Sequence, residues 1–450
     1  MRKHMPHREV ESDVETKLNL ISLRAKDDST YRFTCLAHLL NEEFLEQCFH
    51  SLGKNKASGV DGVSWKEYGE NLQEKIRDVV NRMKAKQYRP QPARRVYIPK
   101  DEHTKRPLGI PVQEDKMVGN ALSRVLESIY EVDFYDCSHG FRKNRGCQTA
   151  LKAVNELLLK QPVNHVIEAD IKGFFDNLSH KWMMEFISRR IKDPSVVRII
   201  ARFLIAGYMD SELLVASNTG VPQGGTLSPL LANVFLHYVL DEWFTEEIKP
   251  HVTGQCHLVR YADDFIIVVQ FKDEAYRIME LLRERFAQFD LLLHPEKTRI
   301  ISFGKYEVVN AGKQNRKANT FDFLGLTHYC TKSGHGGFLV GRVTIAKRFR
   351  KKVKELKEWF KDNRNVLQLK ELWKSLKRKI QGHYAYYGIS GNYRGVKRYY
   401  QCAVKLAFKW LNRRSQKKSF NWEQFTKYLK AFPLPKPRIV HQLYKLSIVK

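Results

Sequence analysis

Hydrophobic and polar residues recur at two spacings along this chain, and the spacings predict where helices and strands lie. Apolar residues three or four positions apart predict helices within residues 13–52 and near residues 68–88, 114–130 and 274–289. Short apolar or alternating runs between turn residues predict strands within residues 94–111, 165–170, 257–269, 294–304 and 321–332. Strands and helices mixed in this way are typical of an α+β fold.

The chain after about residue 343 has a purely helical pattern. Three apolar stripes predict a small bundle of three amphipathic helices. The stripes are Phe349, Val353, Leu356 and Phe360; Leu369, Leu372, Trp373, Leu376 and Ile380; and Val396, Tyr400, Val404, Phe408 and Leu411. The segment FPLPKPRIVHQLY (432–444) is basic and rich in proline, so we expect an extended arm or a docking strap there.

Charge is distributed unevenly between the two parts. The protein has a net charge of +29, and residues 341–450 alone contain 30 Lys and Arg against 5 Asp and Glu. This asymmetry indicates a polyanionic partner for the basic part. The alternative is a basic helical face that serves only solubility, although solubility needs a net charge of only about 2–8.

Composition narrows the class of protein and its location. The seven cysteines include no CxxC pair, which disfavours a zinc finger, and their scatter disfavours a disulfide framework. No run approaches the roughly 18 apolar residues of a membrane-spanning helix. The charged first residues also lack the apolar segment of a signal peptide. We therefore expect a cytoplasmic protein without a membrane partner.

Two adjacent aspartates, Asp263 and Asp264, stand before a strongly apolar strand in RYADDFIIVV (260–269). In isolation such a pair favours an ordinary turn. The apolar run, however, predicts a buried hairpin, in which carboxylates need compensation. Asp170 lies near the end of another apolar strand, and adjacent strands would bring the three carboxylates together. Three carboxylates suit two Mg²⁺ ions about 3.5–4 Å apart, so we expect a turn that also binds metal.

Three further segments contain candidate ligand-binding residues. Lys100 and Arg106 lie on the two arms of the predicted first hairpin, where both could reach a triphosphate. When these two residues are considered alone, a solvated basic hairpin explains them better than a triphosphate site. The glycines of PQGG (222–225) would let the backbone approach a substrate closely, or form an ordinary loop. Arg142 in HGFRKNRG could belong to a loop that grips phosphate.

In combination these segments are specific. RPLGIP, HGFRKNRG, ADIKGFFDNLSH, GVPQGGTLSPLLANVFLHYVLD, RYADDFIIVV, HPEKT and FDFLGL occur in the order of reverse transcriptase sequence blocks. Over about residues 35–330 the chain resembles the group II intron reverse transcriptases of bacteria and organelles. QGHYAYYGIS, YYQCAVKLAFKWLNRRSQKK and FPLPKPRIVHQLY resemble the maturase thumb of that family.

The resemblance implies a right-hand polymerase, with fingers and a palm on an antiparallel sheet and then an α-helical thumb. The expected divisions are an N-terminal helical extension (1–52), fingers and palm (53–335), a three-helix thumb (336–412) and a short basic tail (413–450). Many family members end in an endonuclease domain with clustered Cys and His. We expect no such domain here, and hence a primer from another source.

The resemblance also implies residue roles. Asp170, Asp263 and Asp264 would be the catalytic carboxylates and would bind two Mg²⁺ ions. The dNTP would contact Lys100, Arg106, Phe174, Gln223 and Lys297. Phe174 would exclude a 2′-hydroxyl, although a core aromatic is the plainer reading of this residue. Primer and template would contact Arg142, Gly224, Leu324 and Gly325.

Several tyrosines interleave with the positive charge of the predicted thumb, where they could stack on unpaired bases. They are Tyr384, Tyr386, Tyr387, Tyr393, Tyr399 and Tyr400. Core packing is the alternative for about half of them.

The function implied is RNA-directed DNA synthesis by a mobile group II intron, together with assistance to splicing. The expected partners are group II intron RNA, an RNA template with a DNA primer, target DNA and dNTPs, at the nucleoid of a bacterial cell. A homodimer is compatible with the sequence. Two alternatives remain open: an RNA-binding splicing chaperone with vestigial polymerase activity, and a domesticated relative that serves host defence or repair.

Overall fold

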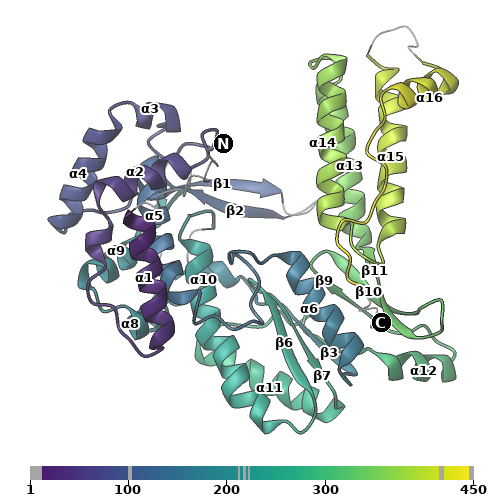
Figure 1. The fold of residues 1–450 in the computed structure, drawn as a ribbon, viewed down its shortest axis with the longest axis horizontal. Helices are drawn as coiled ribbons and strands as arrows, with labels where there is room; N and C mark the ends of the chain where they lie inside the picture. Colours follow the sequence, from purple (N-terminus) through teal and green to yellow (C-terminus); the bar gives the residue numbers. More distant parts are fainter. Residues whose placement is uncertain are drawn as a thin grey trace, which may run out of the picture.

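The computed structural model describes residues 13–99, 104–210, 213–215, 219–220, 223–414 and 420–444. An N-terminal lobe and a C-terminal helical bundle stand apart on a common base (Figure 1). The fold is a mixture of helices and small sheets, as the sequence pattern predicts. None of the described helices is both long and apolar enough to cross a bilayer.

The base contains a four-stranded antiparallel sheet in the order β6-β7-β3-β8. Its strands are β3 (His165–Ala169), β6 (Cys256–Tyr261), β7 (Asp264–Val269) and β8 (Arg299–Ser302). Strand β7 is rich in β-branched residues, which favour the extended conformation. Ile267 and Val269 pack into the core that includes α11 (Lys272–Gln288), and Ile266 and Val268 pack into the core that includes α6 (Cys147–Lys160). Both faces of β7 are therefore buried.

The N-terminal lobe is helical with one projecting hairpin. Its helices are α1 (Asp13–Asp27), α2 (Glu42–Ser51), α3 (Trp65–Gly69), α4 (Leu72–Lys84) and α5 (Gln113–Tyr130). The predicted first hairpin is confirmed as β1 (Ala93–Pro99) paired antiparallel with β2 (Lys105–Ile110). Short strands β4 (Tyr208–Asp210) and β5 (Leu213–Val215) extend this sheet. The hairpin reaches across the gap toward the helical bundle (Figure 1).

Further helices complete the part of the chain before the C-terminal sheet. They are α7 (Phe174–Asn177), α8 (His180–Arg190), α9 (Pro194–Ile205), α10 (Ser228–Leu236) and α12 (Lys305–Lys313). Helix α10 continues through two π-helical segments, His237–Glu242 and Phe244–Ile248, into a short 3₁₀ turn at Lys249–His251.

The C-terminal part begins with a sheet of β9 (Thr320–Phe323), β10 (Leu326–Lys332) and β11 (Phe338–Thr344). The three predicted helices are present as α13 (Ala346–Asn363), α14 (Leu369–Tyr387) and α15 (Tyr393–Leu411). A fourth helix, α16 (Trp422–Ala431), lies within the segment that we expected to be only a short basic tail. Asn421 caps it through the backbone N–H of Gln424, and Phe425 is buried beside Phe408.

The segment after α16 packs along the bundle as the expected docking strap. The hydroxyl of Tyr384 donates to the carbonyl of Pro435 (3.0 Å), and the N–H of Val440 donates to the carbonyl of Gly388 (2.6 Å). Near its end, the carbonyl of Leu443 accepts a hydrogen bond from Asn155 of α6. The strap thus connects the bundle with the base.

Candidate functional site

The register of the central sheet brings Asp170 to the aspartate turn. Strands β6 and β7 pair up to Tyr261 and Asp264, so the intervening residues form a tight turn. Strand β3 pairs with β7 up to Ala169 and Phe265. The next positions in this register are Asp170 and Asp264. The prediction that adjacent strands place the carboxylates side by side agrees with this topology.

The turn is strained and closely supported. Ala262 has a left-handed backbone with φ of 56°, which few residues other than glycine adopt. Gly140 lies directly against it, because a Cβ on Gly140 would be only 2.4 Å from the nitrogen of Ala262. The amide of Asn233 donates to the carbonyl of Gly140 at 2.7 Å. The HGF segment is therefore a backbone support for the aspartate turn.

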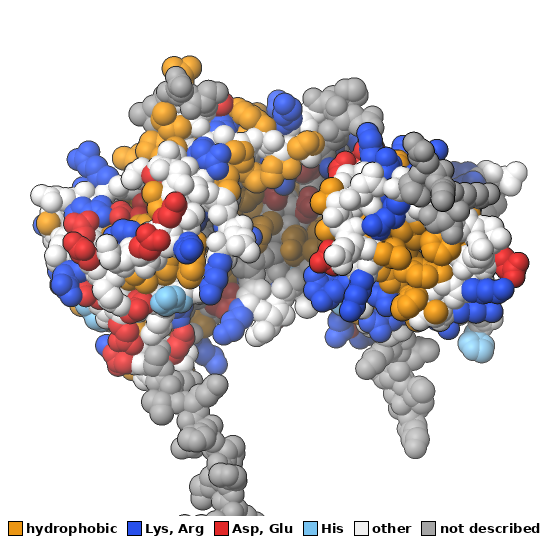
Figure 2. Space-filling view, turned by 90° about the horizontal axis from the view of Figure 1, so that it is seen from above, with side chains coloured by type: hydrophobic (Ala, Val, Ile, Leu, Met, Phe, Trp, Pro, Cys, Tyr) orange, Lys and Arg blue, Asp and Glu red, His pale blue; other side chains and the backbone are white. Residues whose placement is uncertain are grey.

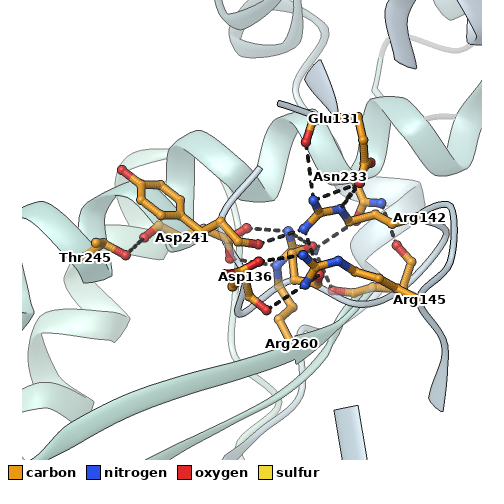
Figure 3. A network of polar contacts seen from close by, with 12 residues as sticks. Glu131, Asp136, Arg142, Arg145, Asn233, Asp241, Thr245 and Arg260 are labelled. Atoms are coloured by element: carbon orange, nitrogen blue, oxygen red, sulfur yellow. Dashed lines mark hydrogen bonds and ion pairs between the residues drawn. The ribbon is translucent and has the colours of Figure 1, made fainter. Parts of the chain in front are cut away.

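A buried arginine, Arg260, also binds this turn and belongs to the polar network drawn in Figure 3. Arg260 is completely buried and forms an ion pair with Asp241, which is also completely buried. The remaining guanidinium hydrogens bond Asn233 (3.0 Å), the carbonyl of Ala262 (3.2 Å) and the hydroxyl of Ser138 (2.8 Å). A buried charge needs this degree of compensation. Sequence reasoning missed the network, because nothing in the sequence links Arg260 to Asp241.

The three carboxylates influence one another electrostatically. The side chain of Asp264 is exposed, but the protein walls around it reduce its hydration. This desolvation, followed by the charges of Asp263 and Asp170, raises the pKa of Asp264 to about 6. Figure 2 shows acidic side chains at the floor of the hollow between the two lobes, and many Lys and Arg side chains on the bundle. The hollow is thus an acidic site beside a basic wall.

Lys297 contacts the first of these carboxylates. Its ammonium group lies 2.5 Å from Asp170, and the backbone N–H of His294 donates to the carbonyl of Asp170 at 2.7 Å. The HPEKT segment is therefore attached to the end of β3. In the described part of the chain, no three His, Cys, Asp or Glu side chains are arranged to hold a metal ion. Carboxylate oxygens are nevertheless the ligands that a hard divalent cation prefers. Such an ion would offset the charges of Asp263 and Asp170, which after desolvation raise the pKa of Asp264.

The PQGG segment is attached to the projecting hairpin. The carbonyl of Gln223 accepts a hydrogen bond from the N–H of Gly109 on β2 (2.6 Å). Gly224 has φ of 112°, and a Cβ there would be 2.7 Å from the carbonyl oxygen of Gly109. Only glycine allows this approach. Arg106 is exposed on β2, whereas Lys100 lies outside the described residues.

Phe174 does not face the hollow. Its side chain is only 2% exposed and packs edge-on against Phe175 and Phe235 in the hydrophobic core. This burial supports the alternative that Phe174 is a core aromatic, and it disfavours the expected contact with the sugar of a dNTP. The adjacent Phe175 is only half-buried. Two consecutive phenylalanines look alike in the sequence, which is why the pattern could not separate them.

Arg142 is likewise used inside the protein. Its side chain is 3% exposed and forms an ion pair with Glu131 at 2.9 Å (Figure 3). It also donates to the carbonyls of Tyr135 and Ser138 at 2.7 and 2.9 Å. This internal pairing disfavours the expected contact of Arg142 with primer or template. Arg142 instead fixes the loop that carries Gly140.

The FLGL segment forms the turn between β9 and β10. Leu324 and Gly325 both have positive φ, at 48° and 81°. The hydroxyl of Tyr386 on α14 donates to the carbonyl of Leu324 (3.1 Å). A Cβ on Gly325 would be 3.1 Å from a guanidinium nitrogen of Arg348, whose charge also lowers the pKa of Asp264. Sequence reasoning missed Arg348, which lies among many basic residues of α13.

The tyrosines of the bundle divide as anticipated. Tyr384, Tyr387 and Tyr399 are buried, whereas Tyr393 is 48% exposed and Tyr386 and Tyr400 are half-buried. Core packing therefore accounts for three of the six.

Comparisons with known proteins identify the family of the chain. A family model described as "Reverse transcriptase (RNA-dependent DNA polymerase)" matches residues 98–328. Group II intron-encoded protein LtrA of Lactococcus lactis subsp. cremoris is 39% identical over 222 residues, which is 49% of this chain and 37% of LtrA. Protein YkfC of Escherichia coli (strain K12) is 32% identical over 314 residues, covering 61% of this chain and 81% of YkfC. Nuclear intron maturase 4, mitochondrial, of Arabidopsis thaliana is 25% identical over 157 residues, or 34% of this chain and 19% of that protein. The chain thus matches little more than a third of the length of LtrA. The aspartate turn lies inside residues 98–328, which the family model matches. The chain belongs to the reverse transcriptase (RNA-dependent DNA polymerase) family.

Proposed function

We propose that this protein is the RNA-directed DNA polymerase of a mobile group II intron, and that it also binds the intron RNA to promote splicing. The observation that carries the proposal is the convergence of Asp170, Asp263 and Asp264 at the ends of β3 and β7. The hollow between the lobes, with acidic side chains at its floor and a basic helical bundle beside it, supports the proposal (Figure 2). In this assignment the N-terminal lobe is the fingers, the base is the palm and the bundle is the thumb. Target DNA would bind in the same hollow, where its strand would be extended as the new DNA is synthesised.

The three aspartates would bind two Mg²⁺ ions, which when bound would activate the 3′-hydroxyl of the primer and neutralise the triphosphate. Lys297 would leave Asp170 and turn toward the phosphates of the incoming dNTP. Arg106 and Lys100 would bind those phosphates from the fingers hairpin. This hairpin is close to the thumb, since Lys351 of α13 donates to the carbonyl of Pro99.

The sugar and the primer would be positioned by other residues. We assign the contact with the sugar to the half-buried Phe175 instead of Phe174. Gln223 and Gly224 would line the nucleotide pocket, because their backbone is fixed to the fingers at Gly109. The turn of Leu324 and Gly325 would contact the end of the primer.

The test is primer extension on an RNA template with a DNA primer, Mg²⁺, and either dNTPs or rNTPs. Wild-type protein is expected to synthesise DNA from dNTPs only. Asp263→Asn is expected to abolish synthesis while RNA binding persists. Asp362→Asn, which changes an exposed aspartate of α13, is the matched control and is expected to be fully active. Extension by Asp263→Asn at the wild-type rate would overturn the assignment. Absence of extension by wild-type protein that still binds RNA would favour the splicing chaperone.

A further inference from the structure

A pocket on the thumb lies outside the hollow that contains the aspartates. It has a volume of about 510 Å³ and opens where the first turns of α13 and α15 meet strands β10 and β11. Arg350, Arg394 and Arg398 line it, together with Phe349 and Val343. No acidic side chain of the described chain is among its lining residues. The pocket therefore combines uncompensated positive charge with an apolar wall.

The pocket is separated from the catalytic side by α13 itself. Arg348 and Lys352 line a different hollow, which they share with Tyr386 of α14. Successive residues of an α-helix point about 100° apart, so Arg348 and Arg350 leave α13 in different directions. Arg348 lies beside Gly325 and acts on Asp264. Helix α13 thus serves two separate surfaces, of which only one adjoins the aspartate turn.

The composition of the α13–α15 pocket suits one nucleotide with an unpaired base. Its volume falls within the roughly 300–1,000 Å³ of small-ligand pockets. The guanidinium of Arg398 lies 5.0 Å from the centroid of Phe349, which gives an aromatic and planar surface on which a base can stack. The exposed Arg350 and Arg394 are placed to bind the flanking phosphates. A fully paired duplex could not offer a base to this pocket.

We propose that the α13–α15 pocket binds an unpaired nucleotide of a structured RNA that is not the strand being copied. The inference rests on the proposed function, which supplies the RNA partner. It adds that the thumb contacts nucleic acid at two independent places, the template duplex on one side of α13 and a loop or bulge of RNA on the other.

The test is equilibrium binding of a hairpin RNA with an unpaired loop, measured at several salt concentrations in the full-length protein. Arg394→Ala/Arg398→Ala removes one phosphate contact and the stacking surface, so it should weaken binding about tenfold or more and reduce the slope of log K against log[salt] by about 1. The matched control is Lys374→Ala/Arg378→Ala, which removes the same charge from exposed positions on α14, and it should have a clearly smaller effect. Arg394→Lys/Arg398→Lys should recover only part of the affinity, because lysine lacks the planar group that stacks.

Three comparisons identify the ligand. The wild-type protein and the double variant should differ less in their affinity for three other ligands. These are the blunt duplex form of the RNA, the same hairpin made of DNA, and free nucleoside monophosphates. Preference for free nucleotides would assign the pocket to a small molecule and would overturn the proposal. Equal losses in the double variant and in the control would also overturn it.

Primer extension separates this proposal from the proposed function. Arg394→Ala/Arg398→Ala should extend a short primer on a short unstructured template at the wild-type rate. A parallel loss of extension and RNA binding would place the pocket on the path of the copied duplex and would contradict the proposal. If wild-type protein fails to extend primers while the double variant still loses hairpin binding, the proposed polymerase function fails and the pocket assignment stands.

Discussion

The ammonium group of Lys297 lies 2.5 Å from a carboxylate oxygen of Asp170. A lysine thus supplies positive charge to a carboxylate that we assign to metal binding. Because the side chain of Lys297 is 53% exposed, this contact is weak enough to be exchanged. We infer that the lysine and a divalent cation compete for Asp170.

Replacement of Lys297 should reveal this competition. Lys297→Ala is expected to tighten the binding of Mn²⁺ to the nucleotide-free protein by about two- to fivefold, since an exposed ion pair contributes at most about 1 kcal/mol. The same variant should slow nucleotide addition. Calorimetric titration measures the first effect and single-nucleotide kinetics the second. Lys313→Ala, at an exposed position of α12, is the control; equal Mn²⁺ affinity in both variants would argue against competition.

The contact of Gly140 with Ala262 predicts a defect in activity without loss of the fold. Gly140→Ala places a methyl group 2.4 Å from the nitrogen of Ala262, so the aspartate turn must move. A displacement of about 1 Å in a catalytic group can cost about 10²-fold in rate. We expect a loss of this order in primer extension with RNA binding preserved. Gly312→Ala has nothing within 4 Å and should be active. A wild-type rate in Gly140→Ala would show that the turn tolerates displacement.

The two adjacent phenylalanines should separate sugar selection from stability. Phe175→Ala is expected to increase the use of rNTPs relative to dNTPs, with a small change in the free energy of unfolding. Phe174→Ala should destabilise the protein by about 3–5 kcal/mol, because it opens a cavity in the core, and should leave sugar selection unchanged. Competition between dATP and ATP, together with denaturant unfolding, measures both quantities. If Phe174→Ala changed sugar selection and Phe175→Ala caused the loss of stability, Phe174 would be the residue at the sugar.

A buried histidine predicts acid sensitivity of the thumb. His383 is 6% exposed, stacks on Tyr399, and has no hydrogen-bond partner at either ring nitrogen among the described residues. Burial, assisted by the charge of Lys352, lowers the pKa of His383 to about 4. In the unfolded chain this histidine has an ordinary pKa of about 6.5 and binds the proton more tightly. The free energy of unfolding is therefore unaffected by this group above pH 6.5 and falls as the pH drops from 6.5 toward 4.

Protonation of His383 should lower the free energy of unfolding by about 2 kcal/mol at pH 5. His383→Phe keeps the stacked ring and removes the titration. We therefore expect the free energy of unfolding of this variant, measured in guanidinium, to exceed that of wild type by about 2 kcal/mol more at pH 5 than at pH 8. His335→Phe, at an exposed position, should leave the pH profile unchanged. Identical pH profiles of wild type and His383→Phe would contradict the assignment.

The sequence predicted most helices and strands, because their formation depends on residues that are close together along the chain. The apolar strand after Asp264, the first hairpin and the helices of the bundle follow from period and turn chemistry alone. Helix α16 was missed although its signal is present, since Asn421 and Gln424 form a capping box ahead of Phe425.

The site could be predicted only as far as its residues lie in distinctive segments. The three aspartates are such residues, and the order of the central sheet places them together. The roles of Arg142 and Phe174 could not be read from the sequence, because burial depends on contacts with Glu131 and Phe235 in other segments. The pair of Arg260 and Asp241 depends equally on tertiary structure.

The strap has a mechanical consequence for the thumb. Its end is fastened at several points, where Tyr444 donates to the carbonyl of Val340 on β11, Leu443 donates to Ser390 after α14, and Asn155 of the palm donates to Leu443. A thumb tethered in this way resists swinging outward as a free body, because that motion must first detach the strap. Opening of the bundle would therefore require hydrogen bonds to break in a segment remote from the aspartates. How long the enzyme remains on one strand would then depend on these few hydrogen bonds as well as on the charges that face the nucleic acid.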